Sequence, residues 1–397
     1  MRIGFIENDL RLVSSGACNL VYEWYKLLKP KYQVTFIHWK DAYTSKITSE
    51  FKDANITYAG ENPEILENYD ILIVNHLGEP SEDFYKALEN CKRAITVFVY
   101  HDRTVIRDIY TDLSIKRYID VCDYVLTYQP EFLVKKLEVP ENKVKELDII
   151  TFYKDPKEYL DTRWKLMKNR PINMLYCNRT NNFKGAKLFM GWCEYLRKKE
   201  ETNGLRIMKG FNSEFPHKDL PNYKTLPMTD ASCSEGTPCE VDFFTDDYGD
   251  HEFCKRLLKD SRFVWVAQDY SKYPEEHFDS LEEYMSYLNP DFDGTTLEAI
   301  FSGCIPILHE FNRKCALLDD NELSRYILFY NPEKGYDDLY QQYKQINVNK
   351  AQRKLKELVE LYQNKQIFLN GLELNLMPQS AFDLVNAMAM QIKEQTE

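Results

Sequence analysis

The sequence predicts an α/β protein made of two doubly wound domains, in which helices cover parallel sheets. Three observations lead to this fold class. Short apolar runs of strand length alternate with segments of helical periodicity, and the alternation starts again after a charged stretch near the middle of the chain. The length of 397 residues also exceeds one ordinary domain and fits about two domains of roughly 150–200 residues.

In the first half, the apolar runs have the character of buried strands. Residues 70–75 and 94–100 read DILIVN and AITVFVY, and such continuous runs are typical of strands that are buried on both faces of a parallel sheet. Parallel strands need long crossover connections, which the helical segments between the runs provide. Further strands are expected at 2–6, 34–39 and 123–128, and helices at 17–28, 81–91 and 104–120.

A second cycle of strands and helices begins near residue 171. Strands are expected at 172–177, 205–209, 240–245, 263–268 and 305–309, and helices at 184–199, 294–302 and 375–391; residues 226–239 are expected to form a surface loop. The sequence thus predicts two Rossmann-like domains, 1–165 and 166–374, which face each other across a cleft. A C-terminal crossover helix within 375–397 is expected to pack back toward the first domain.

Composition and charge limit the function classes. The net charge of −12 gives no bulk attraction for nucleic acid, so a DNA substrate would require a local basic face. The ten cysteines are scattered without the spacing of a zinc site, and neither a secretory signal nor an apolar run of about 18 residues is visible. We expect a cytoplasmic protein with reduced thiols and without a metal site or a membrane span.

Two polar segments of the first half follow predicted strands. The turn after the first strand ends in Gly16 and opens a helix, where free N–H groups suit a phosphate; an ordinary serine N-cap is the alternative. His101 and Asp102 follow the strand at 94–100, where they are placed for proton transfer or for holding a substrate hydroxyl. The alternative is a histidine satisfied within the fold, beside an aspartate that caps a helix.

Four basic residues follow His101 within one predicted helical stretch, namely Arg103, Arg107, Lys116 and Arg117. They add local positive charge to an otherwise acidic chain. Because phosphate contacts supply most of the affinity of a protein for DNA, this cluster is the candidate for a DNA-binding face.

The loop after the strand at 172–177 is bracketed by Arg179 and Lys184. Arginine offers a planar fork and lysine a point charge, so the pair can clamp a diphosphate from two sides. Such a clamp stabilises the negative charge that develops when the diphosphate departs. A solvated loop with incidental charges is the alternative interpretation.

The helix predicted from residue 294 begins with Thr295, Thr296 and Glu298. A carboxylate at this position can accept hydrogen bonds from both hydroxyls of a ribose, and the backbone N–H groups of the two threonines can reach a phosphate. The turn Gly303-Cys304-Ile305-Pro306 then leads into the next strand. The alternative is a helix with an ordinary glutamate near its N-terminus.

In this order, the two segments resemble the donor domain of retaining GT-B glycosyltransferases. In that class an arginine and a lysine hold the diphosphate, and a glutamate on a helix that precedes Gly-x-x-Pro holds the ribose. The matching positions are Arg179, Lys184 and Glu298, followed by residues 303–306. Where many of these enzymes have a further acid, this chain has Pro290, with Asp291 and Asp293 nearby.

A closer resemblance is to the DNA α-glucosyltransferases of T-even bacteriophages, which transfer glucose from UDP-glucose to 5-hydroxymethylcytosine in duplex DNA and have relatives that transfer arabinose. It is carried by five segments, DILIVN (70–75), TVFVYHDRTVIR (96–107), CDYVLTY (122–128), NRTNNFKG (178–185) and LEAIFSGCIPIL (297–308). The residue after the His-Asp pair is a histidine in that family, whereas this chain has Arg103.

The resemblance implies a retaining enzyme that moves glucose or arabinose from a UDP-sugar to the hydroxymethyl group of 5-hydroxymethylcytosine in phage DNA, after flipping the base out of the duplex. It implies that His101 and Asp102 contact the transferred sugar and the acceptor. It also implies a monomer that needs no metal cofactor and acts in the cytoplasm of the infected bacterium. Two other functions stay open, namely a GT-B enzyme acting on a cell-surface glycan, lipid or protein, and a non-catalytic GT-B-like binding scaffold.

Overall fold

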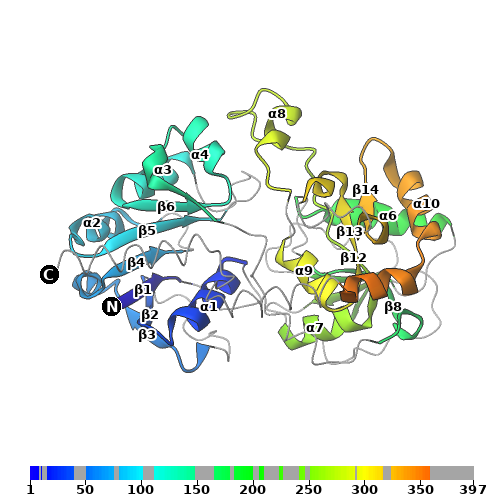
Figure 1. The fold of residues 1–397 in the computed structure, drawn as a ribbon, viewed down its shortest axis with the longest axis horizontal. Coiled ribbons are helices and arrows are strands. Elements are labelled where there is room, and N and C mark those ends of the chain that lie inside the picture. Colours follow the sequence, from blue (N-terminus) through cyan, green and yellow to red (C-terminus); the bar gives the residue numbers. More distant parts are fainter. Residues whose placement is uncertain are drawn as a thin grey trace. The chain divides into compact units, whose positions relative to one another are not determined.

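The computed structural model describes residues 1–8, 10, 16–39, 51–75, 80–101, 111–147, 165–178, 183–199, 205–209, 223–226, 241–245, 251–290, 293–315 and 323–357. These residues form two compact units, each with its own sheet (Figure 1). The first unit comprises the described residues of Met1–Tyr153 and Tyr273–Asn289, and the second those of Lys154–Lys272 and Pro290–Glu373. Segment 273–289, which the sequence analysis places in the second domain, thus packs with the first unit. The crossover helix expected at 375–397 lies outside the described residues.

The first unit contains a seven-stranded parallel sheet in the order β3-β2-β1-β4-β5-β6-β7. Its strands are β1 (Arg2–Ile6), β2 (Gln33–His38), β3 (Asn55–Tyr58), β4 (Ile71–Val74), β5 (Ile95–Tyr100), β6 (Tyr124–Thr127) and β7 (Val144–Glu146). Its α-helices are α1 (Gly16–Leu28), α2 (Glu82–Asn90), α3 (Asp112–Val121), α4 (Pro130–Lys135) and, from segment 273–289, α8 (Leu281–Ser286).

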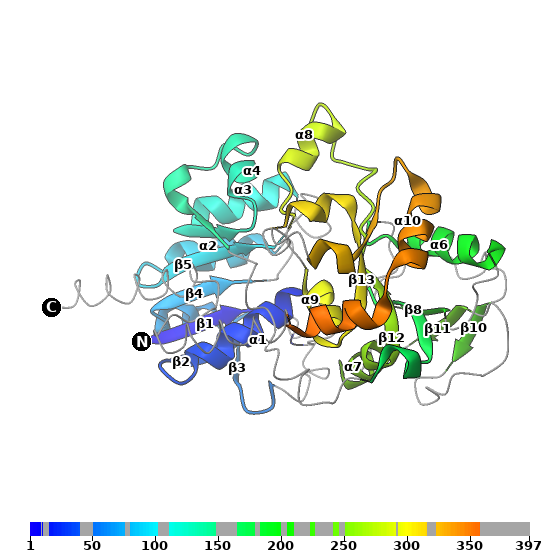
Figure 2. The ribbon, with the colours of Figure 1, turned by 45° about the vertical axis from the view of Figure 1, so that its right-hand side comes forward.

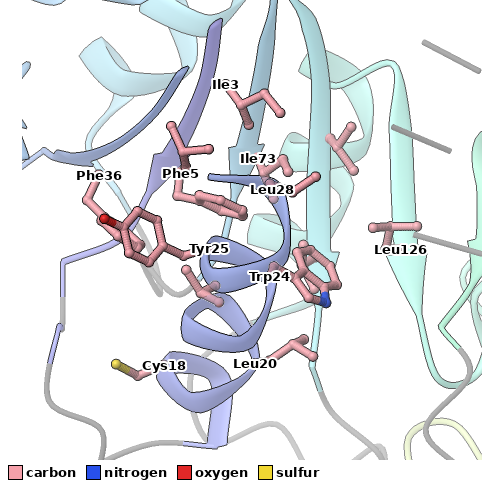
Figure 3. Close-up of a cluster of buried hydrophobic side chains, with 14 of the residues drawn as sticks. Ile3, Phe5, Cys18, Leu20, Trp24, Tyr25, Leu28, Phe36, Ile73 and Leu126 are labelled. Carbon is pink, nitrogen blue, oxygen red and sulfur yellow. The ribbon is translucent and has the colours of Figure 1, made fainter. Parts of the chain in front are cut away.

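The core of the first unit lies where α1 packs on the sheet (Figure 3). Leu20, Trp24 and Leu28 recur on one face of the helix, and Trp24 meets Phe5 of β1 with ring centroids 6.3 Å apart. Each such side chain contributes about 1.5–3 kcal/mol when it is fully buried. The apolar residues that recur with helical spacing in the sequence are the ones that pack on the sheet. This is why their spacing predicted α1.

The second unit contains another seven-stranded parallel sheet, in the order β10-β11-β9-β8-β12-β13-β14. Figure 2 brings its β10 edge into view. The strands are β8 (Ile172–Tyr176), β9 (Leu205–Lys209), β10 (Tyr223–Leu226), β11 (Val241–Thr245), β12 (Ser261–Trp265), β13 (Ile305–His309) and β14 (Leu328–Tyr330). The α-helices include α6 (Ala186–Lys198), α7 (His251–Asp260), α9 (Gly294–Phe301) and α10 (Gly335–Gln345), and residues 348–357 are helical as well.

Each sheet has a point at which the chain reverses its direction of growth. In the first sheet β2 and β3 extend from one side of β1, whereas β4 and the later strands extend from the other side. The switch point of the first sheet thus lies between β1 and β4. In the second sheet it lies between β8 and β12. In open α/β sheets, ligands bind outside the carboxyl ends of the strands at such a point. Both predicted doubly wound sheets are confirmed, and each offers one place for a site.

No helix of the described segments is long and apolar enough to cross a membrane.

Candidate active site

Three polar side chains meet at the carboxyl ends of β1, β4 and β5. Glu7 follows β1, Asn75 follows β4 and His101 follows β5, and these strands are neighbours in the sheet. Asn75 Nδ2 donates a hydrogen bond to Glu7 Oε2, and Asn75 Oδ1 lies 2.5 Å from His101 Nε2. Glu7 and Asn75 are fully buried, whereas His101 is half-buried. The first unit therefore carries a polar group at its topological switch point, with His101 as its most exposed member.

The parallel register explains why these three residues meet. Asn75 N–H donates to Ile6 O at 3.0 Å, and Glu7 N–H donates to Ile37 O at 3.0 Å, so both residues continue the strand ladder. Sequence reasoning selected His101 but missed Glu7 and Asn75. The signal available for both was a single polar residue directly after a buried apolar strand.

Of the other site residues expected in the first unit, the structure describes some and not others. Gly16 is the first residue of α1, as the helix-opening turn predicted. Asp102, Arg103 and Arg107 lie outside the described residues. Lys116 is exposed on α3.

Arg117 is engaged within the fold. Its guanidinium lies 2.5 Å from a carboxylate oxygen of Glu82 and 3.3 Å from one of Glu89, and it stacks over the ring of Tyr85. Hydrogen bonding to Glu82 is the main reason why the pKa of Arg117 is raised. Two carboxylates thus balance the positive charge that the sequence analysis assigned to a DNA contact.

In the second unit, the loop after β8 and the start of α9 are joined by a hydrogen bond. Thr295 Oγ1 donates to Asn178 Oδ1 at 3.2 Å, although the two residues are 117 positions apart. Asn178 Nδ2 is buried without a hydrogen-bond partner among the described residues, and so is Oε1 of Gln268, which follows β12. An amide donor and an amide acceptor therefore stand at the β8–β12 switch point.

The backbone around Lys184 is fixed by the sheet. Tyr176 OH donates to Lys184 O at 3.2 Å, and Asp269 N–H donates to Phe183 O at 2.9 Å. Gly185 has φ +78°, and a Cβ on it would lie 2.0 Å from the carbonyl oxygen of Ala267, so only glycine fits. Lys184 Nζ lies 5.5 Å from the centre of the Phe183 ring. Arg179, its expected partner, lies outside the described residues.

The first turn of α9 differs from the expectation in one respect. Asp293 is the N-cap, and its Oδ1 accepts hydrogen bonds of 2.8 Å from both the N–H and the hydroxyl of Thr296. Thr296 is buried, and its N–H donates to Asp293 within the helix cap, so this N–H already has a partner inside the fold. Glu298 lies half-buried one turn from the start of the helix.

His309 ends β13 and was not selected from the sequence. Its Nδ1 accepts a hydrogen bond of 3.1 Å from Phe311 N–H, and its ring meets the edge of Tyr270 at 4.8 Å. Burial lowers its pKa to about 4, against an opposing influence of Asp269. The imidazole is therefore neutral near pH 7 and adds no positive charge at this end of the sheet.

Within the described segments, no group of three or more His, Cys, Asp or Glu side chains is arranged to hold a metal ion.

No family model matches the chain, and no curated protein matches its sequence. Solved structures do match. An alpha-glucosyltransferase in complex with UDP-glucose and DNA containing an abasic site aligns with TM-score 0.65 and 17% identity, over 90% of this chain and 95% of that chain. An alpha-glucosyltransferase with UDP and a 13-mer DNA containing a HMU base gives TM-score 0.66 and 16% identity, over 93% and 99%.

A glycosyltransferase from Rickettsia africae ESF-5 aligns with TM-score 0.58 and 15% identity, over 98% of each chain. Identities of this size establish likeness of fold. Together with the two parallel sheets, they show that the chain has the two-domain, Rossmann-like GT-B fold and that it resembles the DNA-bound alpha-glucosyltransferases in architecture.

Proposed function

We propose that this protein is a glycosyltransferase that moves a sugar, glucose or arabinose, from a UDP-sugar to 5-hydroxymethylcytosine in phage DNA. The hydrogen bond between Asn178 and Thr295 is the observation that carries the proposal. It joins the loop expected to hold a diphosphate to the helix expected to hold a ribose, at the switch point of the second sheet. Structures of the same fold contain UDP-glucose and DNA.

On the donor side, Arg179 and Lys184 clamp the diphosphate, and Glu298 accepts hydrogen bonds from the ribose hydroxyls. Because Asp293 holds the N–H of Thr296, the N–H groups of Gly294 and Thr295 are the ones that meet phosphate at this helix end. The clamp consists of cationic side chains, so we propose that no metal cofactor is required.

On the acceptor side, His101 holds a sugar hydroxyl and Asp102 orients the hydroxymethyl group. The hydroxymethyl oxygen attacks the anomeric carbon on the face from which the diphosphate leaves, and the departing phosphate oxygen takes up the proton. This course retains the anomeric configuration. Positioning and charge stabilisation then supply most of the rate.

DNA binding is assigned to Arg103, Arg107 and Lys116, with a smaller contribution from Arg117 because Glu82 and Glu89 already pair with it. A base within a duplex does not reach an enclosed site, so the target nucleotide is flipped out. We propose that the protein acts as a monomer in the cytoplasm of the infected host.

The acceptor is tested by incubating the protein with hydroxymethylated duplex DNA and a panel of UDP-sugars, followed by mass spectrometry of the nucleosides. A glycosylated hydroxymethylcytosine with one UDP-sugar supports the proposal, and unmodified duplex DNA is the control. The net charge of −12 favours a second candidate, an enzyme acting on a cell-surface glycan, lipid or protein. UDP release with such an acceptor, and none with hydroxymethylated DNA, would support this second candidate over the DNA enzyme.

The donor assignment predicts that Lys184→Gln lowers kcat by about 100-fold, because one cation that stabilises the departing diphosphate is lost. Lys187→Gln is the matched control, since Lys187 is exposed on the neighbouring helix α6 and carries the same charge. UDP release measures both variants. Equal turnover of the two would contradict the clamp, and no turnover in the wild type with any acceptor would favour a binding scaffold.

A further inference from the structure

The polar chain from Glu7 to His101 has a direction that its own chemistry sets. Asn75 Nδ2 donates to Glu7 Oε2, so the amide group of Asn75 that faces Glu7 is the NH2 group. The carbonyl oxygen of Asn75 then faces His101 Nε2 at 2.5 Å and can only accept. Nε2 of His101 must therefore carry a proton in the neutral ring as well as in the charged ring.

We propose that Glu7 and Asn75 are positioning residues that fix His101 as the Nε2–H tautomer and fix the plane of its ring. The lone pair of the neutral imidazole is then on Nδ1. Any group that meets Nδ1, whether from the protein or from a ligand, must donate a hydrogen bond or a proton to it. A sugar hydroxyl held by this nitrogen is thus bound through its own O–H.

Burial holds Glu7 and Asn75 together in this direction. Glu7 and Asn75 are both fully buried, and a buried carboxylate without a donor is strongly destabilised, so Asn75 is not free to rotate its amide away from Glu7. The three residues stand at the carboxyl ends of three adjacent strands at the switch point, where ligands bind in sheets of this kind. A purely structural carboxylate–amide pair would not need to end on a half-exposed histidine.

The tautomer is tested directly by NMR of the 15N-labelled protein at a pH where the ring is neutral, since two-bond proton–nitrogen correlations distinguish the two tautomers. The chain has only 7 histidines, and the His101 signal is identified by its loss in His101→Gln. We expect a protonated Nε2 and an unprotonated Nδ1. The opposite tautomer in the wild type would overturn the proposal.

Glu7→Gln is the decisive variant because glutamine has the same shape and can either donate or accept. Asn75 can then turn its amide over and present NH2 to His101, so we expect a mixture of both tautomers. The double variant Glu7→Gln/Asn75→Asp forces the original direction again, since the new carboxylate at position 75 only accepts and the new amide at position 7 donates to it. Recovery of the Nε2–H tautomer in the double variant is expected, and a wild-type spectrum of Glu7→Gln would contradict the proposal.

A matched control is Asp123→Asn, the same carboxylate-to-amide change at the amino end of β6 in the same sheet. Asp123 Oδ2 accepts from Thr96 N–H at 2.8 Å and from Thr96 Oγ1 at 3.0 Å. This variant weakens local hydrogen bonds but leaves the chain from Glu7 to His101 intact. The His101 tautomer is expected to stay unchanged.

The consequence for catalysis rests on the proposed function. We expect kcat of Glu7→Gln to fall by about 10- to 100-fold, the usual effect of losing an outer partner that orients a histidine, with KM for the UDP-sugar changed by less than about 2-fold. Unchanged kcat would overturn the positioning role. Failure of the wild type to glycosylate any DNA would instead overturn the proposed function, while the tautomer result would stand by itself.

Discussion

Arg170 is buried in the second unit, and its guanidinium binds three backbone carbonyls. Nε donates to Lys165 O at 3.0 Å, Nη1 to Ser261 O at 2.7 Å and Nη2 to Ser302 O at 2.8 Å. These oxygens belong to the segment before β8, the first residue of β12 and the end of α9. One planar side chain thus ties together three elements at the amino ends of the central strands β8 and β12, away from the carboxyl ends where we propose that the donor binds, so its role is structural.

Arg170→Lys is expected to lower the free energy of unfolding of the second unit by about 2–4 kcal/mol. A lysine ammonium cannot reach three carbonyls in the geometry of a guanidinium, and each lost charged hydrogen bond is worth about 1.5–3 kcal/mol. Urea denaturation measures the loss. The control is Arg262→Lys, because Arg262 is half-buried and its Nε donates to one carbonyl at 3.1 Å; an equal loss in both variants would refute the argument.

His309 makes the second unit sensitive to acid. Its pKa is lowered to about 4 in the folded protein by burial, whereas the ordinary value is 6.5. The unfolded chain therefore binds a proton that the folded chain refuses between these pH values, so stability falls as the pH drops from 6.5 to 4. The loss from this one group amounts to about 3 kcal/mol at pH 4.

The matching variant is His309→Asn, which keeps an acceptor for Phe311 N–H but cannot be charged. We expect the free energy of unfolding of this variant to fall less than that of the wild type between pH 7 and pH 4.5, as measured by urea denaturation at both pH values. Parallel losses in the two proteins would mean that His309 is not the group responsible.

Some residues of the candidate site could be predicted from the sequence and others could not. Lys184, Thr295 and Glu298 were selected because each lies in a local pattern, a strand followed by a polar loop or helix start. The cap of Thr296 by Asp293 was also a local signal, an aspartate just before a helix, and it supplies the partner of the N–H for which the sequence analysis expected a phosphate. Glu7 and Asn75 were missed because their partners come from neighbouring strands, and strand order is not written in the local pattern.

Segment 273–289 is the element whose placement the sequence did not indicate. The chain leaves β12 of the second unit, packs this segment with the first unit and returns to α9. Phe278 stacks on Phe132 of α4 with ring centroids 5.8 Å apart, and Lys136 lies 2.5 Å from Glu283. The contact thus has an apolar centre, where both rings are buried, and a charged margin.

Phe278→Ala is expected to destabilise this contact by about 3–5 kcal/mol, because it removes a buried ring that the surroundings cannot replace. Glu283→Gln is expected to have a smaller effect, since its ion pair with Lys136 is only half-buried and water screens it. Amide hydrogen exchange of α4 measures both, with faster exchange in Phe278→Ala. If only Glu283→Gln accelerated exchange, the ion pair rather than the ring would hold the segment.

The strands that the sequence did not predict share one position, the sheet edge. They are β3, β7, β10 and β14, with the sequences NITY, VKE, YKTL and LFY. The central strands were predicted because burial on both faces requires continuous apolar runs. These edge strands are only three or four residues long, too short to show a clear strand pattern, and their strand character comes from the neighbour to which each pairs.

The whole molecule divides its chemistry between two units with separate sheets. Lys184, Thr295 and Glu298, which we propose bind the donor, belong to the second unit, and His101 belongs to the first. Each unit has its own core, so ligand binding to one unit need not stabilise the other.

UDP alone is therefore expected to protect the second unit selectively. At a concentration about 100 times its dissociation constant, a ligand that binds only the folded state adds about 2.7 kcal/mol of stability. Hydrogen exchange with mass spectrometry should show slower exchange in β8, β12 and β13, with β1, β4 and β5 unchanged. Lys184→Gln should need more UDP for the same protection. Equal protection of both sheets would show that the two units unfold together, and no protection would contradict the donor site.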